Sequence, residues 1–593
     1  MKNSKFKIQN SKFKILYFLS NLKQSSIYLI LFMVWIVSCK NKYKVEPESS
    51  ASKGGTEVYN PNADNVIQLG KKIDNPYALK NMRKAYSSLA RQESLDSTAS
   101  PVHVSHYYVR FLPENWAQYD TLVADTSLEL YNIPLDYEVA VCGNFYHDPS
   151  IPADKPTWQY TSVPVNFKFN SNIKYEILEE LYIPETDVTL KANARKNISN
   201  KSFTNALLDE AMILTKNYDD TLKTNNTART NWNPNGFVKV TDTKLNKDIP
   251  LEGVKIRCRR WVFVKVREAT TNADGWYQTE GFDRPVNYSL IFETNNFDIR
   301  SGTFGQATVD GPKSSSPWNI TFYVDDVNRF YAHVFRGAFR YHYKDIGGLM
   351  RPQNAGFKIK YAAYDKRNSD GDQGVNIGVW SYFGTNPNIL IYRYGENGQY
   401  ESDEIFSTTI HETCHTTHVL NMNLGQISSL QPISYNLGYV QYSQVGEDIA
   451  ESWPVAVEWY ITSKEYRERG ITDYGKETYN NYTRRKDALG NLIRASYPLD
   501  RGYQYWNKSV NAKYSSIFID LVDNFNQSSQ SYRDENNNSY IGINDPVSGY
   551  SLPNIEATFL KYVYGASSLR EQCKKNKPTG VSDTQIDVLL NNL

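Results

Sequence analysis

Five consecutive residues, His411-Glu412-Thr413-Cys414-His415, constrain the fold of this chain more than any other feature. On an α-helix, residues four apart lie on one face and one turn apart, so both imidazoles can reach one metal ion. Glu412 projects about 100° round the helix from His411. The chain has only 8 histidines in 593 residues, and chance would place this pattern in about one such chain in a hundred. The spacing predicts a helix that carries a Zn²⁺ site with a carboxylate base beside it.

The residues around the motif favour a helix. Asp403, Glu404 and Ser407 precede it as first-turn acids and cap candidates, and Gly425 is the expected end. Apolar and threonine side chains recur at helical spacing and predict a buried stripe on another face: Phe406, Ile410, Thr413, Thr417 and Leu420. Because the segment is rich in threonine, a mediocre helix former, we expect tertiary packing to hold it.

A catalytic zinc usually takes three protein ligands and keeps a fourth position for water. The metzincin pattern is excluded, because this chain has His418 and Asn421 where that pattern needs Gly and a third His. Downstream, Gly446-Glu447-Asp448-Ile449-Ala450-Glu451 resembles the second helix of the gluzincins, the thermolysin-like H-E-x-x-H peptidases. The resemblance implies that Glu447 is the third metal ligand and that Glu451 hydrogen-bonds to a ligand histidine.

Glu451 is the alternative third ligand. It replaces the usual Asp of the family, and Pro454 follows within one turn, where it would kink or end the helix. Both acids stay open from the sequence alone.

Two further polar side chains lie in or beside the motif. His418 shares the face of the ligand histidines but lies about 10.5 Å along the axis from His411, too far to join one tetrahedral ion. A place in the cleft or a hydrogen bond to a ligand residue is open for it, and so is a plain packing role. Cys414 points toward the packed side of the helix, where we expect a small buried hydrophobe rather than a thiolate ligand.

The N-terminal segment predicts the location of the protein. A lysine-bearing stretch precedes a short apolar run from residue 25 that ends in Ile36-Val37-Ser38-Cys39. The run is too short for a transmembrane helix and is typical of a secretory signal. The last four residues resemble the bacterial lipobox, which implies cleavage after residue 38 and a lipid on Cys39 at the outer membrane of the cell envelope. An uncleaved N-terminal anchor is the alternative. Residues 39–60 are polar and predict a flexible tether.

Charge and cysteine content exclude several classes of protein. The segment 1–38 holds six lysines and no acids, so the formal charge of +2 becomes −4 after its removal. We therefore expect no nucleic-acid partner. The four later cysteines, Cys142, Cys258, Cys414 and Cys573, are scattered and form no C-x-x-C pair. A disulfide scaffold or a cysteine zinc site is not indicated.

The length predicts a multidomain α+β protein. Residues 61–230 form an N-terminal mixed α/β domain with a helix at 77–95, strands at 105–111 and 137–141, and a helical connector at 206–219. Residues 235–300 alternate in short strands around a D-G hairpin turn in Asn272-Ala273-Asp274-Gly275. This pattern is similar to the carboxypeptidase-regulatory-like β-sandwich, an Ig-like or transthyretin-like spacer. Residues 315–593 are expected to form a zincin-like catalytic domain.

Within the last domain, strands at 357–364 and 388–394 precede the motif helix. We expect the second of them to offer its edge to an extended peptide. A loop with Asp365, Asn368, Asp370 and Asp372 is a candidate Ca²⁺ site, although a solvated turn is the default interpretation. Two function classes follow: a zinc-dependent metallopeptidase, expected to be an endopeptidase, and an inert zincin-like surface lipoprotein that binds or docks. The intact Glu412 favours the first, because an inert site needs no base.

Overall fold

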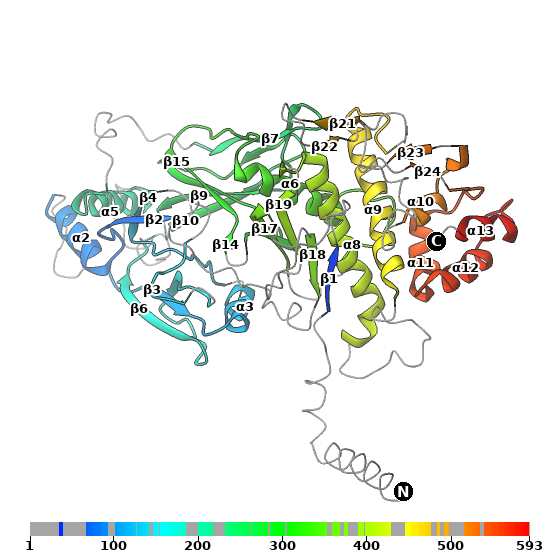
Figure 1. Ribbon diagram of the computed structural model, residues 1–593. Helices are drawn as coiled ribbons and strands as arrows, with labels where there is room; N and C mark the ends of the chain where they lie inside the picture. Colours follow the sequence, from blue (N-terminus) through cyan, green and yellow to red (C-terminus); the bar gives the residue numbers. More distant parts are fainter. Residues whose placement is uncertain are drawn as a thin grey trace, which may run out of the picture.

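The computed structural model is a mixed α/β structure with several sheets (Figure 1). It describes residues 35–39, 67–92, 101–125, 127–141, 146–152, 155–184, 200–217, 232–261, 264–282, 285–302, 305–352, 358–367, 373–377, 389–395, 398–427, 445–475, 483–486, 492–496, 515–529, 531–533, 539–541 and 543–591.

The N-terminal region follows the predicted order of elements. Helix α2 (Leu79–Gln92) packs against α5 (Asn200–Leu214), with Tyr86 and Phe203 in edge-to-face contact. Its other elements are β2 (Gln68–Lys72), β3 (His106–Leu112), α3 (Trp116–Ala124), β4 (Tyr137–Val141), β5 (Gln159–Pro164) and β6 (Lys174–Leu181). Strand β3 lies between β5 and β6, and β2 pairs with β4. The helix at 77–95, both strands and the helical connector are thus present, with ends shifted by a few residues.

Two four-stranded sheets form the next region and share one hydrophobic core. The first has the order β10 (Val264–Thr270), β9 (Lys255–Trp261), β12 (Val286–Ile291), β15 (Thr308–Ser314). The second joins β11 (Trp276–Gln278), β7 (Asn235–Asp242) and β16 (Ile320–Phe322), with β8 (Lys247–Pro250) also on β7. The short strands expected over residues 235–300 are therefore present. The same two sheets extend past residue 300 through β15 and β16.

The turn at Asn272–Gly275 is present but does not close a hairpin, which corrects the prediction. Asn272 Oδ1 accepts the backbone N–H groups of Asp274 and Trp276, and Gly275 has φ +73°. Its flanking strands β10 and β11 belong to different sheets, so the turn carries the chain from one sheet to the other. Local turn chemistry fixed the shape of the loop, whereas tertiary pairing chose the partners of its strands.

A seven-stranded sheet lies beside this region and connects it to the helices. Its order is β1 (Trp35–Cys39), β18 (Gln373–Ile377), β19 (Ile389–Gly395), β17 (Ile359–Arg367), β13 (Phe297–Ser301), β14 (Gly305–Gln306), with β20 (Gly398–Gln399) also on β19. Strand β19 was expected to offer a free edge. That prediction is wrong, because β17 and β18 pair with its two sides. Strand β1 is the outer strand on that side, and it pairs antiparallel with β18 over five residues.

Three long helices pack beside this sheet. Helix α6 (Val327–Tyr343) packs on α8 (Ser402–Ile427), and α8 packs on α9 (Glu447–Glu468). Helix α8 ends at Ile427, two residues past the expected end at Gly425, since one glycine near a helix end costs only about 1 kcal/mol. Pro454 was expected to kink or end the following helix. Helix α9 continues through Pro454, whose neighbours Trp453 and Val455 are fully buried and hold the turn in place.

Short elements complete the C-terminal side, where α10 contacts α9. They are β21 (Thr483–Lys486), β22 (Leu492–Ser496), α10 (Ile517–Asp520), η8 (Gln527–Ser529), β23 (Ser531–Arg533), β24 (Ser539–Ile541), α11 (Leu552–Thr558), η9 (Leu560–Tyr562), α12 (Ala566–Lys575) and α13 (Asp583–Leu590). Cys258, Cys414 and Cys573 are buried free thiols, and Cys142 lies outside the described residues. Within the described part of the chain, none of the helices has the length and apolar character needed to cross a membrane.

Candidate metal centre

The helix that carries the motif is threonine-rich, and its own hydroxyls explain how it stays helical when buried. Thr409, Thr413 and Thr417 each donate a hydrogen bond to the backbone carbonyl four residues earlier, at 2.7, 2.7 and 2.9 Å. These bonds satisfy hydroxyls that would otherwise be costly to bury. The stripe predicted from the sequence is buried at Phe406, Ile410, Thr413 and Thr417, whereas the side chain of Leu420 lies outside the described residues.

The start of α8 matches the predicted acidic first turn. Asp403 and Glu404 lie in it, and the Glu404 carboxylate accepts the backbone N–H of Glu401 at 2.8 Å. Ser407 is not a cap: it is buried one turn further in, where its hydroxyl donates to the carbonyl of Glu404. Helix α8 therefore begins at Ser402, five residues before Ser407.

Two contacts fix α8 against its neighbours. Gly337 of α6 lies so close to α8 that a Cβ there would be 2.7 Å from Thr409 Cβ. The Thr413 hydroxyl is 2.8 Å from Tyr361 Oη on β17. The helix thus packs against α6 on one side and against the seven-stranded sheet on another. The face that carries His411 and His415 is turned toward α9.

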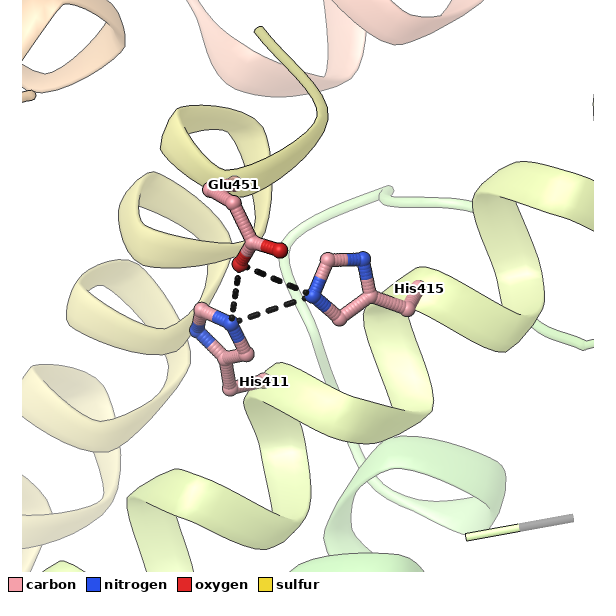
Figure 2. Close-up of side chains that lie close together, drawn as sticks. All are labelled: His411, His415 and Glu451. Atoms are coloured by element: carbon pink, nitrogen blue, oxygen red, sulfur yellow. Dashed lines mark hydrogen bonds and ion pairs between the residues drawn. The ribbon is translucent and has the colours of Figure 1, made fainter. Parts of the chain in front are cut away.

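Helix α9 brings a glutamate to the two histidines (Figure 2). The Nε2 atoms of His411 and His415 are 3.2 Å apart. Glu451 Oε2 lies 3.6 Å from Nε2 of His411 and 3.4 Å from Nε2 of His415. Among the described residues, these three form the one group of histidine, cysteine and acidic side chains whose ligand atoms gather closely enough to hold a metal ion.

The size of this triangle fits zinc. Ligands about 2.0–2.1 Å from a tetrahedral Zn²⁺ are about 3.3 Å from each other. The three edges, 3.2, 3.4 and 3.6 Å, bracket that value. Two imidazole nitrogens and one carboxylate oxygen are also a ligand set found in catalytic zinc sites.

Glu447 was the favoured third ligand in the sequence interpretation. It is the first residue of α9, and its side chain lies outside the described residues. Glu451, the alternative, is the acid whose carboxylate reaches both imidazoles, one helical turn further along. The role expected for Glu451, a hydrogen bond to a ligand histidine from outside the triangle, is taken by a different residue.

That residue is Glu458, which the sequence interpretation did not single out. Its Oε2 accepts a hydrogen bond from Nδ1 of His411 at 2.9 Å, and the side chain is fully buried. Glu458 lies seven residues after Glu451, so both project from the same face of α9. The signal in the sequence was the two-turn spacing between Glu451 and Glu458. The family pattern instead directs attention to the acid that lies four residues after the third metal ligand.

The site is strongly charged and closed from solvent. His411, Glu412, His415 and Glu451 are at most 3% exposed. Burial alone would lower the pKa of His411, but the carboxylates of Glu451 and Glu458 outweigh it and raise this pKa to about 9. Burial lowers the pKa of His415, and it would raise that of Glu451, whose pKa the two imidazoles instead hold well below its usual range. Without metal, His411 is therefore an imidazolium cation, with a proton on both ring nitrogens, at neutral pH.

The remaining predicted residues occupy the same helix or a distant loop. His418 is buried and outside the triangle, and burial lowers its pKa to about 3, so it stays neutral. Cys414 is buried in the core and its thiol pKa is raised by burial, which fits a packing role. Asp365 pairs with Arg393 at 2.8 Å, and the rest of the candidate Ca²⁺ loop lies outside the described residues.

Comparison of the chain with protein-family models, curated proteins and solved structures found no match. The geometry of the site is therefore the basis for any functional assignment.

Proposed function

We propose that this protein is a zinc-dependent metallopeptidase with His411, His415 and Glu451 as metal ligands. The observation that carries the proposal is the triangle of ligand atoms, whose edges of 3.2, 3.4 and 3.6 Å fit tetrahedral zinc. Bound zinc would acidify a water molecule and polarise a scissile carbonyl. The arrangement is similar to that of the gluzincins, with Glu451 in place of Glu447 as third ligand.

Each acidic residue then has its own task. Glu458 accepts the Nδ1 proton of His411, which leaves the Nε2 lone pair of that ring directed at the metal position. Glu451 supplies the single anionic ligand. Glu412 follows His411 on the helix and is near enough to contribute to the raised pKa of that imidazole. We assign it the transfer of a proton from the attacking water to the leaving amine.

A peptide or protein is the substrate class that the fold supports. Strand β18 is the outer neighbour of β19, and it packs against α8. Cleavage after residue 38 would remove all of β1 except Cys39, and β18 would then offer a free edge to an extended peptide.

An inert binding protein is the second candidate. The observation in its favour is the burial of all three ligands and Glu412, since a substrate must reach the metal. A peptidase of this structure has to open around the site during turnover.

The Glu412→Gln substitution distinguishes these functions. The variant is nearly isosteric, so it should fold, bind one equivalent of zinc and lose about 10²–10⁴ in cleavage rate. We would digest a peptide library and unfolded proteins with wild type and variant in parallel, with Glu571→Gln on the exposed face of α12 as a charge-matched control. Equal cleavage by wild type and Glu412→Gln contradicts the assigned base. Absence of cleavage by zinc-loaded wild type supports the binding protein.

We also propose that the chain is anchored to the bacterial cell envelope by a lipid on Cys39. Support comes from the lipobox-like residues 36–39 and the acid-free, lysine-bearing segment before them. Mass spectrometry of the membrane fraction should find a diacylglyceryl-modified Cys39 as the first residue. A mature chain that begins elsewhere contradicts this proposal.

A further inference from the structure

A second group of buried acids lies outside the metal centre, beyond the ligand helix α9. Asp520 is the last residue of α10, and Asp545 follows β24. Their side chains belong to the most deeply buried polar groups of the molecule, at 0% and 4% exposure. Asp523 lies at the margin of the group and is partly exposed.

The hydrogen bonds of the two buried carboxylates are unequal. Asp520 accepts from the Ser516 hydroxyl at 2.8 Å and from Gln527 Nε2 at 3.0 Å. Asp545 Oδ1 accepts the backbone N–H of Val547 at 3.0 Å. The other oxygen, Asp545 Oδ2, is buried and has no hydrogen-bond partner within the part of the chain that the structure describes. A buried carboxylate oxygen of this kind is costly unless it meets a cation or a donor.

The side chains whose charges act on Asp520 and Asp545 are themselves aspartates. The charge of Asp545 raises the pKa of Asp520, and the charge of Asp523 raises the pKa of both. Burial is the main reason why the pKa of Asp545 is raised to about 8, and it also raises the pKa of Asp520. Neither buried acid has an ion pair with Lys, Arg or His in the described residues. The described residues thus supply no positive charge to balance either carboxylate once it is ionised.

We propose that Asp520 and Asp545 bind a divalent cation, with Asp523 at the rim of the site. The donors are all oxygen atoms, which is the chemistry of Ca²⁺ rather than zinc. The acids are less tightly gathered than the ligands of the metal centre, because no three of them lie close enough to be a compact metal group. Calcium accepts such a site, since it takes 6–8 oxygens in flexible geometry and completes them with main-chain carbonyls and water.

This cation would brace the ligand helix. At the start of the segment that carries Asp520, Ser515 donates its backbone N–H to the hydroxyl of Ser452 at 2.9 Å. Ser452 is the neighbour of the metal ligand Glu451. Phe518 of α10 meets Trp453 edge to face at 5.3 Å between ring centroids. A cation on Asp520 therefore stabilises α10 against the turn of α9 that presents Glu451.

The test uses the full chain as purified, dialysed into calcium-free buffer and titrated with CaCl₂. Calorimetry should show one site with Kd on the order of 10⁻⁴–10⁻³ M, the range of extracellular calcium modules. Thermal unfolding should shift to higher temperature as Ca²⁺ is added. The shift should grow from pH 5 to pH 8, because Asp545, with a pKa raised to about 8, carries a proton at the lower pH.

Asp545→Asn is the decisive variant. It keeps the shape of the side chain and removes the repulsion, so without calcium it should be at least as stable as wild type. Its calcium-induced shift should be absent, and its Ca²⁺ affinity should fall on the order of tenfold or more, because charged ligands set that affinity. Asp520→Asn should behave alike, whereas Asp274→Asn, an exposed change of equal charge, should retain the full response.

Two results would overturn the proposal: no Ca²⁺ binding by wild type at 10 mM CaCl₂, roughly ten times the weakest expected Kd, or an equal response in wild type and Asp545→Asn. A stability that depends on pH but not on calcium would show instead that the two acids share a proton. None of these measurements uses peptidase activity or the zinc ligands, so the outcome is independent of the proposed function.

Discussion

Zinc affinity should depend steeply on pH because the metal must displace a proton from His411. The pKa of that imidazole is raised from 6.5 to about 9 by its two carboxylate neighbours, in spite of its burial. At pH 7 only about one molecule in a hundred then has a neutral His411, so proton competition weakens zinc binding about 100-fold relative to high pH, or about 2.7 kcal/mol. An unshifted histidine would weaken it by only about 1.3-fold.

Both the direction and the steepness of the pH dependence of zinc affinity follow from the structure. Affinity should rise about tenfold for each pH unit between 7 and 9 and level off above that. Only one proton should compete, because the pKa of His415 is lowered and that of Glu451 is held well below its usual range. Competition with a chromophoric chelator from pH 6 to 10 gives the affinity. Calorimetry in buffers of different ionisation enthalpy gives the number of protons released.

The Glu458→Gln substitution tests whether the Glu458 carboxylate contributes to the raised pKa of His411. Above pH 9 the variant should bind zinc about 10–100-fold more weakly, because His411 loses the carboxylate that orients it and increases its basicity. The difference in zinc affinity between wild type and variant should become smaller toward pH 7, because a proton on His411 competes less strongly with zinc in the variant. Glu571→Gln serves as the exposed control. A wild-type affinity that stays constant between pH 7 and 9 would refute the reasoning.

The other predictions concern the third ligand and the packing of α8. Glu451→Gln should lose bound zinc in elemental analysis, whereas Glu447→Gln should keep it; the reverse result would restore Glu447 as the ligand. Gly337→Ala should destabilise the fold by about 1–3 kcal/mol in urea denaturation. Its new Cβ would lie 2.7 Å from Thr409 Cβ and 2.9 Å from the carbonyl oxygen of Phe406, which outweighs a gain of about 1 kcal/mol in helix propensity. Unchanged or higher stability would contradict this packing.

Much of the local structure was available from the sequence, because it depends on periodicity within one segment. The H-E-x-x-H motif with its buried stripe predicted α8 and the common face of His411 and His415. Strand-like runs predicted β17 and β19 to within a few residues. Asn272–Gly275 was correctly predicted as a turn, since Asx side chains and glycine specify turns locally.

What the tertiary structure decided is how these elements meet. The sequence left Glu447 and Glu451 open, because the rotation of α9 about its axis, which the packing of Trp453 and Val455 determines, selects the acid that faces the histidines. The same rotation brings Glu458 to His411 across 47 residues of chain. Strand partners were equally undetermined: β10 and β11 flank one turn yet lie in different sheets. A ligand or a strand neighbour is a contact between distant segments, and one segment's pattern records which face is buried but not what covers it.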